Sequence, residues 1–233
     1  MEITFKIFRF NPESDHKPRY QEYKIKTHPG MTVLDALNEI KWEQDGTLTF
    51  RKSCRSGICG SCAMKIHGLN GLACEKQIEP MKKSRIVIEP LPGFELLKDL
   101  AVNMDPFYRH LEEVKPYLIN DEPPPARERN QSPEEFKQIV DPIACILCGS
   151  CTSSCPSFWY DKEYLGPAAI YKAYRYCFDT RDRGAADRFE VLDNKHGLWR
   201  CHTIFNCMDA CPKHLKITHG IALLKRRMIF EKF

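Results

Sequence analysis

Twelve cysteines carry the most evident chemistry in this 233-residue chain, and most of them fall into short, regular runs. The first run has the spacing C-x4-C-x2-C and is followed by a fourth cysteine after eleven residues. Plant-type 2Fe-2S clusters are bound by thiolates at this spacing. The run therefore predicts a 2Fe-2S site with the ligands Cys54, Cys59, Cys62 and Cys74.

Glycines flank the cysteines of this first run. Gly57 and Gly60 allow the loop to fold tightly around an inorganic core and to direct backbone N–H groups at sulfur, as an anionic site requires. A zinc site is the alternative, but zinc knuckles usually have paired C-x2-C arms. Zinc or disulfides would leave the protein colourless, whereas iron and acid-labile sulfide would make it brown.

The second run has the spacing C-x2-C-x2-C-x3-C-P, which is the pattern of bacterial ferredoxins. It comprises Cys145, Cys148, Cys151 and Cys155, with Pro156 after the last cysteine. In two-cluster ferredoxins the fourth cysteine of each run binds the other cluster. This run therefore predicts three ligands to one cluster and one ligand to a second.

A third run fits the same template with one position changed. Cys201, Cys207 and Cys211 occupy the first, third and fourth positions, and Ile204 occupies the second. The crossing rule then assigns Cys145, Cys148, Cys151 and Cys211 to a 4Fe-4S cluster. Cys155, Cys201 and Cys207 remain, and three thiolates predict a 3Fe-4S cluster. Ile204 offers no donor atom, and we expect its side chain to exclude water.

The twelfth cysteine, Cys177, lies within a helical pattern that follows Pro167. Cysteine is among the most frequently buried residue types, so we interpret Cys177 as a core residue. The alternative is that Cys177 supplies the ligand that is missing from the third run.

Charge and hydropathy exclude several classes of protein. The formal charge is +4, and 28% of the residues are charged, which argues against a disordered polyelectrolyte and against a nucleic-acid binder. The N-terminal residues MEITFKIFRF alternate polar with apolar side chains, which is typical of a strand and not of a signal peptide. We expect a cytoplasmic protein without a membrane span.

The remaining pattern predicts an α+β chain with two domains, over residues 1–103 and 104–233. In the first domain we expect strands near residues 3–7, 23–25, 63–66 and 85–88, with a helix after Thr32. Helical patterns follow around residues 96–100, 106–117 and 215–230, and Pro133 and Pro167 are placed to begin two more helices. The tract over residues 121–135 reads as an exposed connection.

Taken together, the motifs resemble the iron-sulfur subunit family of succinate dehydrogenase. The resemblance covers nearly the whole chain and includes FRKSCRSGICGSCAMKI, GLAC, KDLAVNM, VKPY, ACILCGSCTSSCPSFWY, LGPAAI, DTRDR and RCHTIFNCMDACPK. It implies a β-grasp ferredoxin-like domain followed by a helical domain with the other two clusters. It also implies that electrons leave an FAD on a partner flavoprotein subunit and pass through the 2Fe-2S, 4Fe-4S and 3Fe-4S clusters to a quinone.

The resemblance implies a quinone pocket beside the third cluster. Its matching positions here are Pro156, Ser157, Trp159, Tyr160, His202 and Ile204. Many relatives have a second tryptophan at the position of Tyr160, so either ubiquinone or menaquinone is compatible with the sequence. His202 and Trp159 have equally simple structural interpretations, as a hydrogen-bonding and a packing residue.

The same resemblance implies partners and a location. We expect two kinds of partner, a flavoprotein subunit and membrane-anchor subunits. Haem in the anchor subunits is compatible with the family. We expect no nucleic acid as a partner. The chain would then lie on the cytoplasmic side of a bacterial inner membrane, held there by its partners. A quinol:fumarate reductase subunit and a soluble multi-cluster ferredoxin are the alternative functions.

Overall fold

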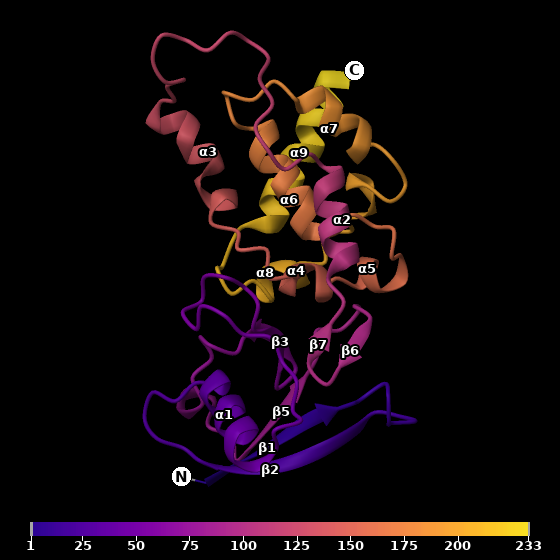
Figure 1. Ribbon diagram of the computed structural model, residues 1–233. Coiled ribbons are helices and arrows are strands. Elements are labelled where there is room, and N and C mark those ends of the chain that lie inside the picture. The colour runs from indigo at the N-terminus through magenta and orange to yellow at the C-terminus, as the bar shows by residue number, and fades with distance from the viewer. Residues whose placement is uncertain (1, 233) are drawn as a thin grey trace. The chain divides into compact units, whose positions relative to one another are not determined.

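The computed structural model describes residues 2–232, which form two compact units (Figure 1). The first unit contains residues up to Met104 together with Ile146–Ser154, and the second contains Asp105–Cys145 and the residues from Cys155 onward. The division after residue 103 stays a prediction. The packing of Ile146–Ser154 with the first unit was not anticipated from the sequence.

A mixed five-stranded sheet forms the first unit, with the strand order β2-β1-β5-β3-β4. The strands β1 and β2 pair as the predicted antiparallel hairpin, and β1 pairs with β5 in parallel, an arrangement typical of a β-grasp sheet. The elements of this unit are β1 (Glu2–Arg9), β2 (Arg19–Lys26), α1 (Val33–Glu39), the π-helical turn η1 (Ile40–Gln44), β3 (Ala63–Ile66), β4 (Leu69–Leu72), the 3-10 turn η2 (Glu79–Met81), β5 (Arg85–Glu89), β6 (Leu96–Lys98), β7 (Ala101–Val102) and α4 (Ser150–Ser153).

Local sequence signals account for the sheet and for its helix. Ile3, Phe5 and Ile7 are all buried and alternate along β1 with partly exposed residues. Thr32 caps α1: its hydroxyl accepts a hydrogen bond from the amide of Asp35, whose carboxylate in turn accepts one from the amide of Thr32. This capping box stabilises the start of a helix whose apolar side belongs to the same core as the strands.

The helix predicted around residues 96–100 is wrong, because this segment forms the hairpin of β6 and β7. Asp99 lies in the turn with a φ of 47° and is buried. Its carboxylate accepts hydrogen bonds from the Arg9 side chain (3.0 Å) and from the amides of Phe10 (2.9 Å) and Thr49 (2.8 Å). These tertiary contacts override the helical pattern, since they require a turn at Asp99.

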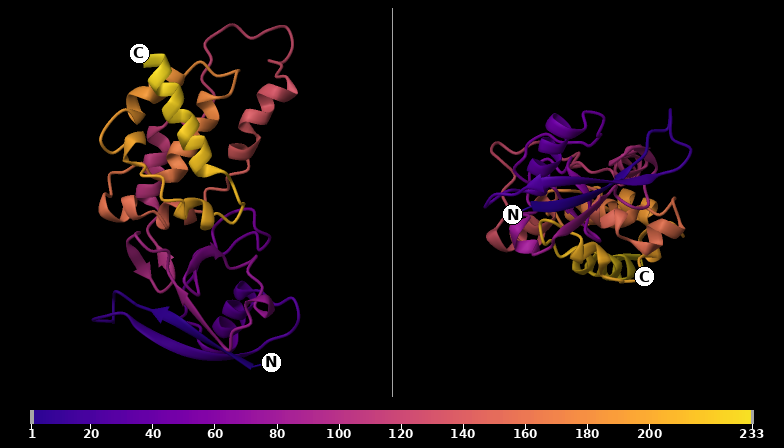
Figure 2. Two further views of the ribbon diagram at one scale, coloured as in Figure 1. Left: turned by 180° about the vertical axis from the view of Figure 1, so that it is seen from behind. Right: turned by 90° about the horizontal axis from the view of Figure 1, so that it is seen from below.

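The second unit is helical, and α6 lies at its centre, packed against α2, α3, α7 and α9. Figure 2 shows α9 from behind as the long yellow helix at the end of the chain. No helix among the described residues is both long and apolar enough to span a bilayer. The elements are α2 (Asp105–Glu113), α3 (Pro133–Ile143), α5 (Pro156–Tyr160), α6 (Gly166–Cys177), α7 (Ala185–Leu192), the 3-10 turn η3 (Leu198–Arg200), α8 (Asn206–Asp209) and α9 (Ile217–Lys232).

Two helix starts in this unit follow from proline positions. Pro133 opens α3 after Ser132, which forms a second capping box with Glu135, and Pro167 lies in the first turn of α6. Both starts confirm the sequence-based expectation. The exposed connection expected over residues 121–135 is shorter than predicted. Residues 121–128 are exposed and form neither helix nor strand, but residues 133–135 already belong to α3.

A buried arginine fixes the path of the chain next to α7. Arg188 is fully buried, and its guanidinium donates to the carboxylate of Asp182 (2.7 Å) and to the carbonyl groups of Lys115 and Tyr117. The pair is fully desolvated, so removal of either partner would leave an uncompensated charge in the core.

Candidate metal centres

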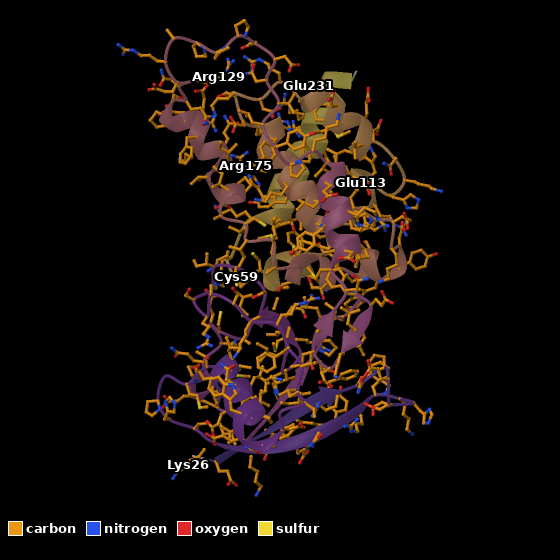
Figure 3. The ribbon with its side chains drawn as sticks, viewed as in Figure 1. Lys26, Cys59, Glu113, Arg129, Arg175 and Glu231 are labelled. Atoms are coloured by element: carbon orange, nitrogen blue, oxygen red, sulfur yellow. The ribbon has the colours of Figure 1, made fainter. Side chains whose placement is uncertain are left out.

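The first cysteine run forms a loop whose amides point at sulfur. The Cys54 sulfur accepts hydrogen bonds from the amides of Cys59 (3.2 Å), Ile58 (3.3 Å) and Ser56 (3.5 Å). The amide of Gly57 donates to the Cys74 sulfur at 3.3 Å. Figure 3 labels Cys59 on this loop, which precedes β3. Such amide donors stabilise negative charge on thiolate and sulfide, so the loop fits an anionic cluster.

Both glycines of this loop are required by its geometry. Gly57 and Gly60 have φ values of 70° and 73°, a region that residues with a side chain rarely adopt. A Cβ atom at Gly57 would lie 1.9 Å from a carboxylate oxygen of Glu75, and one at Gly60 would lie 2.8 Å from the Cα of Cys148. At Gly60 the neighbour is backbone, so a side chain has no room there; at Gly57 the Glu75 side chain can move away, and the positive φ is the reason for glycine.

The four thiols of the first run differ in environment. Cys54 is exposed, and hydrogen bonds from the amides of Ser56, Cys59 and Ile58 lower its pKa to about 6. Cys62 is buried, and burial raises the pKa of its thiol to about 12. Bound metal would deprotonate both thiols. Within residues 2–232 no three His, Cys, Asp or Glu side chains surround a position for a single metal ion; the fit to a cluster rests on the amides and the glycines.

Two cysteines of the second run, Cys148 and Cys151, belong to the first unit. Their segment is attached there by Asn70, whose amide donates to the carbonyl of Ser150 (3.1 Å) and to the hydroxyl of Ser153 (3.2 Å). The Ser153 hydroxyl donates in turn to the carbonyl of Pro92 at 2.7 Å. These contacts explain why nine residues of the cysteine run pack with the sheet unit.

The other two predicted four-iron ligands, Cys145 and Cys211, belong to the second unit. Cys145 follows α3, and its carbonyl accepts a hydrogen bond from the ammonium group of Lys172 at 3.4 Å. Lys172 also donates to the carbonyl of Pro142 at 3.4 Å, so one side chain of α6 holds the chain where α3 ends. Burial lowers the pKa of this lysine.

The backbone repeats between the second and third cysteine runs. Leu147 and Thr203, each two residues after the first cysteine, have φ values of 54° and 58°. Gly149 and Phe205 follow two positions later, with φ values of 78° and 71°, and each precedes a four-residue helix, α4 or α8. This register places Ile204 where the second run has a cysteine, in agreement with the template used on the sequence.

The three thiols predicted to bind the third cluster all lie in the second unit. Cys155 is the N-cap of α5, Cys201 follows η3, and Cys207 lies within α8. The carbonyl of Cys201 accepts a hydrogen bond from Lys225 at 2.8 Å. The hydroxyl of Thr218 lies 3.4 Å from the sulfur of Cys207.

Three residues that touch these loops were missed in the sequence analysis. Lys172 and Thr218 make the contacts described above, and Tyr164 is buried near the thiols of the third set. All three lie outside the cysteine runs, and no spacing rule marks them. The one available signal is that α9, which carries Thr218, begins six residues after Cys211; α6, which carries Lys172, begins eleven residues after Cys155, and Tyr164 lies before that helix.

The residues predicted to shape a quinone pocket lie on α5 and on the loop before α8. Ser157 is buried, whereas Trp159 and Tyr160 are 47% and 85% exposed. Ile204 is 45% exposed, so the expectation that its side chain excludes water does not hold within this chain. The reason is its position in the loop before α8, where its side chain is only partly covered. His202 is exposed as well.

The interpretation of Cys177 as a core residue is confirmed. Its side chain lies in α6 and is 4% exposed. Burial raises the pKa of the thiol to about 12, as expected for an apolar environment that disfavours the thiolate.

Two family models and two solved structures match this chain. Residues 4–109 match the family model of the 2Fe-2S iron-sulfur cluster binding domain, and residues 137–212 match that of the 4Fe-4S dicluster domain. The fold resembles a chain of the Mycobacterium smegmatis Sdh1 complex in the apo form, with a TM-score of 0.86, 23% identity and coverage of 99% of this chain and 97% of that one. A hypothetical protein from Helicobacter pylori is similar at a TM-score of 0.58 and 17% identity, covering 96% of this chain and 39% of that chain.

A curated relative decides the family. The mitochondrial iron-sulfur subunit of succinate dehydrogenase [ubiquinone] from Candida glabrata is 46% identical over 232 residues, which cover 98% of this chain and 92% of the relative. The match therefore spans both units of the chain. With the mixed sheet, the helical unit and the amide-lined thiol loop described above, it shows that this chain belongs to the family of succinate dehydrogenase iron-sulfur subunits.

Proposed function

We propose that this chain is the electron-transfer subunit of a membrane-bound succinate dehydrogenase. When bound, its 2Fe-2S, 4Fe-4S and 3Fe-4S clusters would supply one-electron carriers between the FAD of a flavoprotein subunit and a quinone. The observation that carries the proposal is the 46% identity to a succinate dehydrogenase subunit over 98% of the chain. The chain has no dinucleotide-binding glycine fingerprint of its own, so the flavin belongs to the partner.

The first cluster would be held by Cys54, Cys59, Cys62 and Cys74. The supporting observations are the amide hydrogen bonds to the Cys54 and Cys74 sulfurs. In this role the loop backbone binds the core and stabilises its negative charge, and the buried thiols Cys62 and Cys74 keep part of the core away from water.

The other two ligand sets follow from the crossing rule of two-cluster ferredoxins. The repeated backbone conformation of the two runs supports it, because equivalent φ values place equivalent positions in the same role. We assign the 4Fe-4S cluster to Cys145, Cys148, Cys151 and Cys211. We assign the 3Fe-4S cluster to Cys155, Cys201 and Cys207.

The quinone would bind beside the 3Fe-4S ligands, at Pro156, Ser157, Trp159, Tyr160, His202 and Ile204. Supporting this assignment, the apolar side chains of Trp159, Tyr160 and Ile204 are exposed in the described chain. Large exposed apolar side chains are compatible with a surface that a partner or ligand covers. Membrane-anchor subunits and the quinone would cover them in the complex.

The location is part of the proposal. No described helix can span a bilayer, so the chain would be held at the membrane by its partners. We place it on the cytoplasmic side of a bacterial inner membrane. Protease digestion of right-side-out and inverted membrane vesicles tests this side, because the chain should be cleaved only in the inverted ones.

Purification of the complex from solubilised membranes tests the function. We expect a flavoprotein and one or more anchor subunits to copurify, with flavin, about nine irons per copy of this chain and succinate:quinone reductase activity. A higher rate of quinol-dependent fumarate reduction than of succinate oxidation would instead indicate a quinol:fumarate reductase. A monomer without flavoprotein or anchor would indicate a soluble multi-cluster carrier.

A further inference from the structure

A tyrosine hydroxyl is buried in the second unit without a well-formed hydrogen bond. Tyr164 lies between α5 and α6, its side chain is fully buried, and among the described residues its hydroxyl has only a weak interaction, with the thiol of Cys201. A buried hydroxyl without a good hydrogen bond is energetically costly, and such atoms in native proteins usually have a partner such as a bound ion or cofactor. The groups around Tyr164 should therefore indicate which hydrogen-bond acceptor its hydroxyl binds.

The groups that act on this hydroxyl are the thiols of the third set. The thiols of Cys201, Cys155 and Cys207 all lie close enough to the Tyr164 hydroxyl to act on it electrostatically. Among the three thiols Cys201 has the largest effect. The hydroxyl thus lies close to all three proposed ligands of one cluster.

A second buried hydroxyl touches the same set from another helix. Thr218, in the first turn of α9, is 5% exposed, and its Oγ1 lies 3.4 Å from the sulfur of Cys207. A cluster-bound thiolate has no proton to donate, so the threonine hydroxyl must then be the donor. Two hydroxyl groups, from outside the cysteine runs, are therefore available to the sulfurs of this site.

We propose that Tyr164 and Thr218 are hydrogen-bond donors to the sulfurs of the 3Fe-4S cluster and raise its reduction potential. The inference rests on the ligand set given under the proposed function. Reduction adds one electron to the site and makes its sulfurs more negative, so hydrogen bonds to them strengthen and favour the reduced form. The electron comes from a one-electron donor, which is the preceding carrier in the complex. The O–H bonds stay intact throughout.

The test is a redox titration of the purified complex, followed by electron paramagnetic resonance of the oxidised three-iron signal. In Tyr164→Phe, at a fixed ambient potential, we expect the ratio of reduced to oxidised cluster to fall about threefold to tenfold. This corresponds to a midpoint lower by about 30 to 60 mV. In Thr218→Val we expect a smaller decrease, because one weaker donor to one ligand sulfur is removed.

Tyr174→Phe is the matched control. Tyr174 lies in α6 of the same unit, is buried, and its hydroxyl donates to the carbonyl of Gln138 at 3.0 Å instead of to a thiol. This variant also loses one buried hydroxyl, and we expect its midpoint to equal that of the unmodified complex. Spin quantification of each oxidised sample should give a full three-iron signal.

An unchanged midpoint in both Tyr164→Phe and Thr218→Val would overturn the proposal. So would an equal shift in Tyr174→Phe, or loss of the three-iron signal from Tyr164→Phe, since the tyrosine would then act on packing or cluster retention. An incorrect ligand assignment would give a different result, because the unmodified complex would then have no three-iron signal.

Discussion

Replacement of Ile204 by cysteine should convert the third centre from three irons to four. The repeated backbone of the two cysteine runs places Ile204 at the position equivalent to Cys148. The flanking φ values differ by only 4° (54° and 58°) and 7° (78° and 71°) between the runs, so a thiol at Ile204 would project from nearly the same backbone. It would supply the donor that a fourth iron requires.

The size of the effect follows from the composition of the clusters. Conversion of a 3Fe-4S to a 4Fe-4S cluster adds one iron, so the content should rise from about nine to about ten irons per copy of the chain. The substitution should hardly affect folding, because Ile204 is 45% exposed and the apolar area that it buries is correspondingly small. We expect a loss of stability below about 1 kcal/mol.

The assay is electron paramagnetic resonance of the oxidised complex together with iron analysis. Ile204→Cys should lose the three-iron signal, have a lower potential at this centre and reduce quinone more slowly. Ile204→Val is the control, since it changes the side chain without adding a thiol and should keep the signal. Full retention of the three-iron signal in Ile204→Cys, with unchanged iron, would refute the argument from the vacant ligand position.

Three further predictions concern the loop, an ion pair and the bound metal. Gly60→Ala should lower the 2Fe-2S content and the melting temperature, because its Cβ would lie 2.8 Å from the Cα of Cys148 and its φ of 73° costs about 1–2 kcal/mol; unchanged visible absorption and melting would contradict this. Burial alone would raise the pKa of Asp161, but the hydrogen bond from His196 brings it below its usual value. This carboxylate therefore stabilises the fold above pH of about 4, and its contribution is lost as the pH falls through the lowered pKa. The urea midpoint of Asp161→Asn should accordingly fall less than that of the unmodified chain between pH 6 and pH 3, and parallel curves would count against the pair. Finally, the protein produced under iron starvation should be cleaved rapidly by protease in its second half, because metal binding is coupled to folding. Protease resistance equal to that of the iron-loaded protein would contradict this prediction.

The features that could be predicted from sequence depend on short spacings or on local hydrogen bonds. The start of α1 was found from the capping box of Thr32, and the start of α3 from Pro133 in its first turn. The cysteine runs are similar, since each ligand loop is built from neighbouring residues. Both kinds of signal remain visible without knowledge of the tertiary structure.

Features that depend on distant residues could not be predicted in this way. The β6 and β7 hairpin has a helical pattern, and only the long-range contact of Asp99 with Arg9 makes it a turn. The attachment of residues 146–154 to the first unit depends on Asn70, which lies about eighty residues earlier in the chain. Tyr164 belongs to the same class, because its role is visible only when its burial and the surrounding thiols are known.

The third cysteine run adopts a backbone conformation that the local preferences of its residues do not explain. Gly149 adopts a φ of 78° without strain, because glycine populates this region freely. Phe205, at the equivalent position, adopts a φ of 71°, and an aromatic residue there costs roughly 1–2 kcal/mol. The run has lost both the glycine that would remove this cost and the cysteine at Ile204, yet it retains the same fold. The strain is offset by other interactions, and binding of the remaining thiolates Cys201 and Cys207 to a cluster would supply them.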